Sequence, residues 1–118
     1  EKEINFYALS VGICKYKGNG IKLLPHAVPD DGKLSGTIIY KNLSKLRLVS
    51  KAPKILKGKF KNLKFISTFD CKSVTVKSLT DNLMTMEVDG ESLGNGPYSF
   101  EIIPCSVNMI INENIKEK

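Results

Sequence analysis

The stretch Ser73-Val74-Thr75-Val76-Lys77 decides the fold class, because its two valines alternate with polar residues. A period of two is the pattern of an antiparallel strand that buries one face and exposes the other. Similar runs follow along the chain, separated by turn sequences such as Asp89-Gly90 and Gly94-Asn95-Gly96-Pro97. Short strands with frequent turns favour a sandwich over a doubly wound sheet. The sequence therefore predicts a mainly β protein, an antiparallel β-sandwich with one or two short helices.

The other apolar or alternating runs place the remaining strands. We expect strands over residues 4–13, 34–40, 63–69, 73–79, 83–88, 98–103 and 106–111.

The segment between the second and third of these strands has a helical pattern. Apolar residues recur at three- and four-residue spacing at positions 43, 46 and 49, with Leu48 as a further candidate, after Asn42, which predicts a helix with Asn42 as its N-cap. Pro53 is expected to break or restart this helix, and a second short turn then ends at Gly58, a typical C-terminal glycine.

The size and composition are those of one folded domain. With 118 residues, of which 42% are hydrophobic and 25% charged, the chain is large enough for its own core, so we expect a single domain over residues 1–118. No apolar run reaches the roughly 18 residues of a membrane span. The chain begins at Glu1 without a methionine or a signal-peptide pattern, so we interpret it as cut from a longer protein.

The three cysteines lack the spacing of a disulfide framework or of a zinc site. Cys14, Cys71 and Cys105 are far apart and outside any CxxC pattern, so we expect reduced thiols. The only histidine is His26. Its pairing with one of the cysteines as a catalytic dyad stays open, although no spacing favours it.

The basic residues are concentrated in one segment. Outside residues 41–64 the chain has nine basic and twelve acidic residues, a net charge of −3. Such a segment could contact nucleic acid or anionic lipid headgroups, or form a solvated helix face. Nine basic residues lie in this basic segment, which has no Asp or Glu: Lys41, Lys45, Arg47, Lys51, Lys54, Lys57, Lys59, Lys61 and Lys64.

Two short acidic turns stand out among the polar residues. They are Pro29-Asp30-Asp31-Gly32-Lys33-Leu34 and Val88-Asp89-Gly90-Glu91, each bordered by strand-like sequence. From the residues alone, the first is best interpreted as an Asx-turn and the second as the tight turn of a hairpin. Their carboxylates are also the groups that a metal site or a general base would use.

In their order along the chain, these motifs resemble the C-terminal lobe of the diacylglycerol kinase and sphingosine kinase-like lipid kinases, including the soluble bacterial type. Leu24-Pro25-His26-Ala27 leading into Asp30-Asp31-Gly32 resembles the family's "P-x-A" and "DDG-x-L" elements, and Asp89-Gly90-Glu91 its "DGE". The family's helix-ending and closing elements are matched by Leu56-Lys57-Gly58-Lys59-Phe60 and Phe100-Glu101-Ile102-Ile103-Pro104, with Phe60 in place of histidine.

The resemblance implies roles for the acidic residues. It implies a magnesium ion at the first turn, with Asp31 as the carboxylate ligand, the carbonyls of Val28 and Lys33 as partners, and Asp30 reaching the ion through water. It implies that Glu91 accepts the proton of a lipid hydroxyl, with Asp89 orienting it, binding a magnesium-linked water, or acting as the base itself.

The same resemblance implies that the chain is half of an enzyme. The family's "GGDGT" nucleotide motif is absent, so ATP would be bound mainly by an N-terminal lobe missing from this chain, which we expect to be inactive alone. The expected partners are a lipid alcohol, ATP and an anionic membrane reached by the basic segment, in the cytoplasm or at the inner face of the membrane. The alternative is a stand-alone basic β-sandwich module that binds nucleic acid or another polyanion. Since aromatic residues are scarce among these lysines, we expect no nucleic acid.

Overall fold

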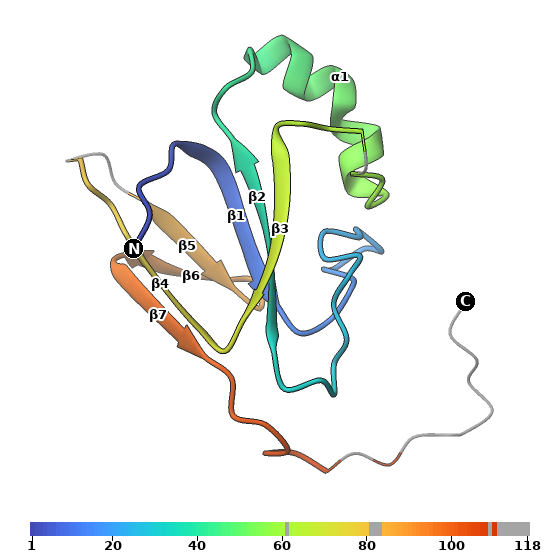
Figure 1. The fold of residues 1–118 in the computed structure, drawn as a ribbon, viewed down its shortest axis with the longest axis vertical. Helices are drawn as coiled ribbons and strands as arrows, with labels where there is room; N and C mark the ends of the chain where they lie inside the picture. Colours follow the sequence, from blue (N-terminus) through green and yellow to red (C-terminus); the bar gives the residue numbers. More distant parts are fainter. Residues whose placement is uncertain (61, 81–83, 109, 111–118) are drawn as a thin grey trace.

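The computed structural model describes residues 1–60, 62–80, 84–108 and 110, and arranges them in seven strands and one helix (Figure 1). The strands form three antiparallel sheets of order β1-β2-β3, β4-β7 and β5-β6. This confirms the predicted mainly β, antiparallel class. The elements in chain order are β1 (Phe6–Gly12), β2 (Leu34–Tyr40), α1 (Lys45–Leu56), β3 (Ile66–Cys71), β4 (Ser73–Lys77), β5 (Thr85–Val88), β6 (Glu91–Asn95) and β7 (Pro97–Glu101).

Strand β2 is the centre of the three-stranded sheet, and its first four residues are buried. Two of these are polar, and each has a partner: Ser35 Oγ donates to Asp70 Oδ1 at 2.7 Å, and Thr37 Oγ1 donates to the carbonyl of Leu23 at 2.8 Å. A buried hydroxyl without a partner would cost about 1–3 kcal/mol, so these bonds allow polar residues in the central strand. They also tie β2 to β3 and to the loop that precedes it.

The sheet has two faces of different character, which alternate along β2. Ile39 pairs with Ile66, and both pack against a buried cluster of Ile55, Leu63 and Phe65, so we call this side the helix face. Ile38 pairs with Ser67 and lies on the opposite side, the cavity face. Half-buried apolar residues that complete the cluster on the helix face are Leu23, Leu43, Leu48 and Phe60.

Helix α1 differs from its prediction at the residue expected to cap it and at the residue expected to break it. Its N-cap is Ser44 rather than Asn42, and the helix continues through Pro53 instead of breaking there. Pro53 lies on the exposed side, where water can bond the carbonyl of Val49 that the missing N–H leaves free. Gly58 ends the helix as predicted, with φ of 68°, and a Cβ at this position would lie 2.9 Å from the carbonyl oxygen of Lys22.

The apolar residues whose spacing indicated the helix divide between core and solvent: Leu43 and Leu48 pack on the core, and Leu46 and Val49 do not. Leu46 and Val49 are 86% and 70% exposed, whereas Leu48 and Ile55 contact the core. The helix carries two apolar stripes, and the sequence alone does not say which of them meets the sheet.

Two strand predictions need correction, and one strand was not predicted. The strand expected at 63–69 begins only at Ile66, because residues 63–65 form turns closed by Leu63 N–H to Phe60 O and Ile66 N–H to Leu63 O. Residues 106–108 and 110 are not in a strand: the chain turns at Pro104, Cys105 has φ of 55°, and the segment's apolar side chains are exposed. Strand β6 was not expected, since its residues are all exposed and do not alternate. Leu83, Met109 and Ile111 of the predicted strands lie outside the described residues.

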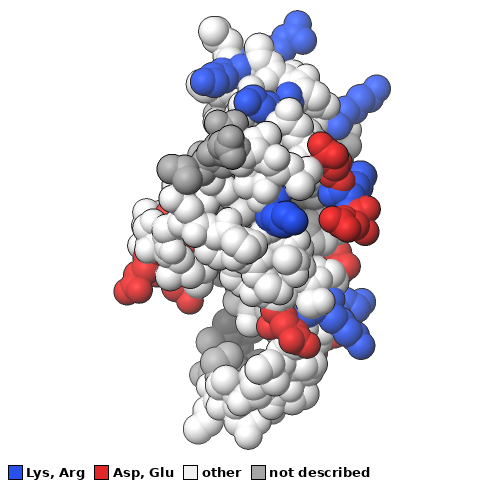
Figure 2. All heavy atoms as spheres, turned by 90° about the vertical axis from the view of Figure 1, so that its left-hand side faces the viewer, with Lys and Arg blue, Asp and Glu red and all other residues white. Residues whose placement is uncertain are grey.

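The basic segment surrounds α1, and of its nine residues only Lys61 lies outside the described part. Figure 2 shows one face of the molecule, on which the upper end carries blue and white spheres while the red acidic spheres lie lower. Since α1 is at the top in the view of Figure 1, the helix end of this face carries basic side chains, whereas further down basic and acidic side chains are mixed. No helix of the described residues is long and apolar enough to cross a membrane.

Candidate functional site

The first acidic turn is a closed loop with both carboxylates at the surface. The N–H of Asp31 donates to the carbonyl of Val28 at 3.4 Å, and Asp31 Oδ1 accepts the N–H of Lys33 at 2.9 Å. The second bond is that of an Asx-turn, which confirms the interpretation from the residues alone. Asp30 and Asp31 are both exposed. The loop therefore presents oxygen atoms to solvent from a backbone that its own bonds hold.

A polar cluster ties this loop to the sheet. His26, one turn before the loop, has its Nε2 3.3 Å from the carbonyl oxygen of Phe69 and 3.6 Å from Asp70 Oδ1. Because Asp70 also accepts the hydroxyl of Ser35, the cluster joins the loop, β2 and β3. The Nδ1 of His26 is buried and has no hydrogen-bond partner within the described residues. These contacts position the acidic loop; they are not part of the site that the sequence indicated.

The three cysteines are free, as predicted, and differ in their surroundings. Cys14 and Cys105 are exposed, whereas Cys71 at the end of β3 is half-buried. Burial raises the pKa of the Cys71 thiol above its usual value, and the neighbouring negative charge of Asp70 raises it further. A raised pKa lowers the fraction of thiolate at neutral pH, so Cys71 lacks the activation of a catalytic nucleophile.

The second acidic turn is the tip of the β5-β6 hairpin. Val88 pairs with Glu91, and the two residues between them, Asp89 and Gly90, have φ of 49° and 88°. Positive φ at both central residues is the signature of a type I′ turn, for which Asp-Gly is a favoured sequence. The hairpin interpretation is confirmed. Asp89 and Glu91 are both exposed, so their carboxylates flank a tight turn and face solvent.

An ion pair connects this hairpin to the glycine-rich loop that follows β1. Lys17 Nζ lies 3.2 Å from Glu87 Oε1, and the loop is closed by the N–H of Lys17 donating to the carbonyl of Ile21 at 2.8 Å. Both charged side chains are 55% exposed, so the pair contributes at most about 1 kcal/mol. The ion pair is informative about position, because it shows that the hairpin with Asp89 and Glu91 lies beside residues 17–21.

The two acidic turns do not merge into one cluster. No group of three or more His, Cys, Asp or Glu side chains that could hold a metal occurs within the part of the chain that the structure describes. Any ion at the first turn would therefore depend on one or two carboxylates together with backbone carbonyls and water. Such a donor set suits magnesium, which takes oxygen ligands and keeps several waters. The residues Val28, Asp30, Asp31 and Lys33 fit this chemistry.

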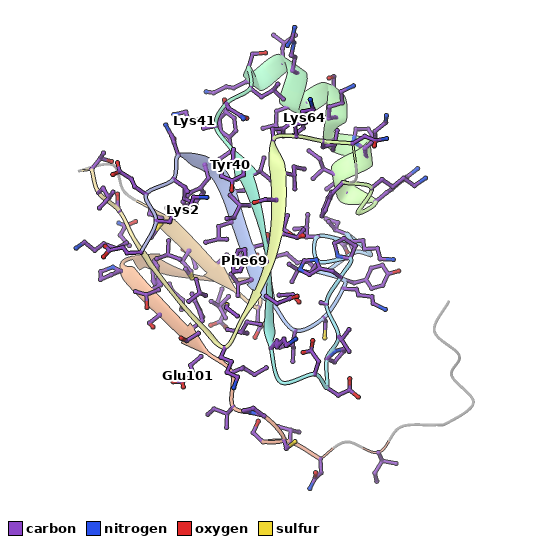
Figure 3. All side chains as sticks on the ribbon, in the orientation of Figure 1. Lys2, Tyr40, Lys41, Lys64, Phe69 and Glu101 are labelled. Atoms are coloured by element: carbon purple, nitrogen blue, oxygen red, sulfur yellow. The ribbon has the colours of Figure 1, made fainter. Side chains whose placement is uncertain are left out.

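A cavity on the cavity face of the sheet was not anticipated. It has a volume of about 340 Å³ and is mainly apolar, with the hydroxyls of Tyr40 and Ser67 2.9 Å apart at one side. Figure 3 labels three of its residues, Lys2, Tyr40 and Phe69, which come from the N-terminal segment, β2 and β3. Alternation in β2 predicts that this face exists but not that it is incompletely filled. The lining residues are Lys2, Ile4, Ile38, Tyr40, Ser67 and Phe69.

The comparison with protein families agrees with the motifs and the fold. The family model described as the YegS C-terminal NAD kinase beta sandwich-like domain matches residues 1–111. No curated protein matches the chain. The match spans the glycine-rich loop, both acidic turns, α1 and all seven strands of the described residues. The chain belongs to the family of C-terminal β-sandwich domains of YegS-like, NAD kinase-like lipid kinases.

Proposed function

We propose that this protein is the acceptor-side lobe of an ATP-dependent lipid kinase of the diacylglycerol kinase type, which transfers a phosphoryl group to a lipid hydroxyl. The observation that carries the proposal is the β5-β6 hairpin tip, where Asp89 and Glu91 flank a type I′ turn and remain exposed. A carboxylate on a tight turn, open to solvent, is accessible to a substrate hydroxyl.

In this proposal Glu91 accepts the proton of the attacking hydroxyl. An alcohol is a poor nucleophile at neutral pH, so removing its proton as the new P–O bond forms lowers the barrier. Asp89, on the other side of the turn, orients Glu91 or the hydroxyl. Phosphoryl transfer also needs groups that hold the nucleotide phosphates. We assign those groups to a separate nucleotide-binding lobe and expect residues 1–118 alone to have no kinase activity.

The cavity on the cavity face is suited to the apolar part of a lipid acceptor. Ile4, Ile38 and Phe69 supply an apolar lining, and the hydroxyls of Tyr40 and Ser67 supply polar atoms at one side. An apolar pocket with few polar groups is the usual form of a small-molecule site. Its volume of about 340 Å³ fits part of an acyl chain rather than a whole lipid.

The first acidic turn is proposed to hold magnesium. Asp31 would supply a carboxylate oxygen, Val28 and Lys33 their carbonyls, and Asp30 a water-mediated contact. The ion would stiffen the loop that His26 and the Ser35–Asp70 hydrogen bond attach to the sheet.

The catalytic assignment is tested with Glu91→Gln in the complete two-lobed protein. We expect phosphorylation of a diacylglycerol to fall by at least about 100-fold, because general-base catalysis typically contributes 10²–10⁴-fold. Glu101→Gln is the matched control, since Glu101 is also an exposed strand glutamate but lies outside the hairpin, and it should keep normal turnover. Unchanged turnover in Glu91→Gln would remove this residue from the mechanism.

The metal assignment is tested by thermal unfolding with and without magnesium. We expect magnesium to raise the Tm of the wild-type protein, because an ion that binds only the folded state stabilises it. Asp31→Ala should abolish this increase, and Asp89→Ala should retain it. An equal magnesium response in wild-type and Asp31→Ala protein would show that the ion is bound elsewhere or not at all.

A further inference from the structure

The cavity on the cavity face has a polar end and an apolar end. Ile38 of β2 lies opposite Ser67 of β3, and two residues along each strand Gly36 lies opposite Phe69. Tyr40 follows Ile38 on the same face, and its hydroxyl lies 2.9 Å from Ser67 Oγ. In Figure 3, Tyr40 lies toward the helix end of the sheet and Phe69 further down β3. The two hydroxyls are therefore at one end of the cavity and the ring of Phe69 is at the other.

The segment before β1 adds a positive charge to this cavity. The N–H of Lys41 donates to the carbonyl of Asn5 at 3.0 Å, which holds the segment beside the end of β2. Lys2 and Ile4 of the segment line the cavity, whereas the glutamates at positions 1 and 3 do not. Lys2 is exposed, so it lies where the cavity meets solvent. Its flexible four-carbon stem lets the ammonium reach a group bound inside.

The polar atoms of the cavity are mainly hydrogen-bond donors. Between Tyr40 and Ser67 one hydroxyl proton is shared, and the other remains to donate to a ligand. The ammonium of Lys2 has N–H donors and no acceptor. None of the lining residues is acidic. The cavity is therefore suited to a ligand group that accepts hydrogen bonds and carries a negative charge.

Gly36 shapes the apolar end. A Cβ built on this glycine would overlap the ring of Phe69, so the ring lies directly on the backbone of β2. In this position the ring borders the cavity instead of crossing it. The volume of about 340 Å³ is near the lower end of the range for ligand pockets. One hydrocarbon chain suits this space better than the two chains of a diacylglycerol.

We propose that the cavity binds the carboxylate end of a free fatty acid. The two carboxylate oxygens accept hydrogen bonds from Lys2 and from the remaining hydroxyl of the Tyr40–Ser67 pair. The methylenes next to the carboxylate pack on Ile38 and Phe69. Charge-assisted hydrogen bonds and burial of the chain then act together.

The fatty acid would compete with the lipid acceptor for the cavity. This consequence rests on the proposed function, which places the acceptor chain in the same space. The binding itself does not, because it requires neither ATP nor Glu91. A fatty acid would therefore regulate the lipid kinase by occupying its acceptor site.

The donor set distinguishes a carboxylate from other head groups. An alcohol would leave the ammonium of Lys2 without a charged partner, and an alkylammonium would be repelled by it. A phosphate monoester carries close to two negative charges and three acceptor oxygens. The lining offers one cation and one remaining hydroxyl donor, which match the single charge and two oxygens of a carboxylate.

Calorimetric titration of the complete protein without ATP tests the head group. We expect saturable binding of dodecanoate below the concentration at which it forms micelles. Dodecanol and dodecylamine should bind at least about tenfold more weakly, because hydrogen bonds to charged groups are the stronger class. Dodecyl phosphate should also bind more weakly. The proposal is overturned if the alcohol or the phosphate binds as tightly as the carboxylate.

Substitutions of polar residues locate the carboxylate. Lys2→Gln should weaken dodecanoate binding about tenfold, and Tyr40→Phe about fivefold, through lost hydrogen bonds. Lys2→Gln should leave the binding of dodecanol unchanged. Lys41→Gln is the matched control, since Lys41 is also an exposed lysine next to Tyr40 but does not line the cavity. Equal dodecanoate binding by Lys2→Gln and the wild type would overturn the assignment.

Substitutions at the apolar end locate the chain. Gly36→Ala should displace the ring of Phe69 into the cavity and weaken binding of dodecanoate and dodecanol alike. Gly18→Ala is its control, since a Cβ on Gly18 meets nothing within 4 Å. Ile38→Phe also narrows the cavity and gives the same expectation if Gly36→Ala unfolds. Unchanged binding in the folded cavity variant would overturn the proposal.

Kinase assays with diacylglycerol test the regulatory consequence. Dodecanoate should raise the KM for diacylglycerol and leave kcat unchanged, and Lys2→Gln should need about tenfold more dodecanoate for the same effect. Glu91→Gln should bind dodecanoate normally even though its turnover is lost. Retained binding without competition would contradict the placement of the acceptor chain in this cavity and leave the fatty-acid site intact.

Discussion

The helix face and the cavity face of the β1-β2-β3 sheet are built from alternate residues of the same strands, but they are filled to different degrees. On the helix face, Ile39 and Ile66 pack on Ile55, Leu63 and Phe65, which are 6–8% exposed. On the cavity face, Ile38 and Phe69 border an empty volume of about 340 Å³.

The two faces of this sheet have different roles: the helix face stabilises the fold, and we propose that the cavity face binds a ligand. The helix face packs against segments that are close to it in sequence, since α1 and the turn at residues 63–65 both lie between β2 and β3 in the chain. Its closed packing stabilises the domain. The cavity face leaves apolar side chains with unfilled contacts, and each missing contact forgoes dispersion energy. A ligand that fills this space would recover those contacts, which is why we place the lipid chain there.

The largest expected effect is at the centre of the helix face. Ile55→Ala should lower the free energy of unfolding by about 2–5 kcal/mol, because it removes buried methyl groups and leaves a cavity. Leu46→Ala, on the exposed side of the same helix, should change it by less than about 0.5 kcal/mol. Urea unfolding curves of the two variants measure both values. Equal losses would mean that α1 packs through both of its apolar stripes.

A sharper comparison uses two neighbouring isoleucines of β2 on opposite faces. We expect Ile39→Ala to lower the free energy of unfolding by about 2–3 kcal/mol and Ile38→Ala by about 1 kcal/mol, since Ile38 already borders a cavity and loses fewer contacts. The two variants remove the same atoms from the same strand, so propensity and chain entropy largely cancel. A larger loss at Ile38 would show that the cavity face is the better packed one.

The smallest expected effect is a dependence on pH at Cys71, on the cavity-face side of β3. Its pKa is higher in the folded state than the usual 9.0, so the folded protein binds this proton more tightly than the unfolded chain. The resulting stabilisation is complete below pH 9 and is lost as pH rises through the folded-state pKa. The free energy of unfolding, measured between pH 8 and about pH 11, should therefore decrease more steeply with pH for the wild type than for Cys71→Ala. If the two slopes are the same, the Cys71 thiol has no altered pKa.

Local sequence predicted the strands well where one residue pattern had one explanation. Residues 34–40 form β2 at the predicted bounds, and Asp89-Gly90 forms the hairpin turn that this dipeptide favours. Prediction from local sequence failed where two residue patterns compete. Around α1, positions 46 and 49 and positions 48 and 55 both have helical spacing, and only the tertiary contact with the sheet selects the second pair. Residues 106–108 alternate like a strand but pair with no strand of the described residues.

The two acidic turns of the candidate site could be predicted from the sequence. Asp31 and Glu91 were identified because acidic residues next to glycine stand out locally, and the family match covers both. The cavity was missed because its lining comes from Lys2, Tyr40 and Phe69, which are far apart in sequence and carry no motif. The ion pair of Lys17 with Glu87 was missed for the same reason.

The contact between Gly32 and Pro104 has a practical consequence for protein engineering. A Cβ built on Gly32 would lie 3.6 Å from Cγ of Pro104, so the segment after β7 lies against the acidic loop. A shortened version of the protein that ends at Glu101 would retain every strand of the described residues, but it would expose this side of the loop. Truncations and C-terminal fusions should therefore keep Pro104 and a flexible spacer after it.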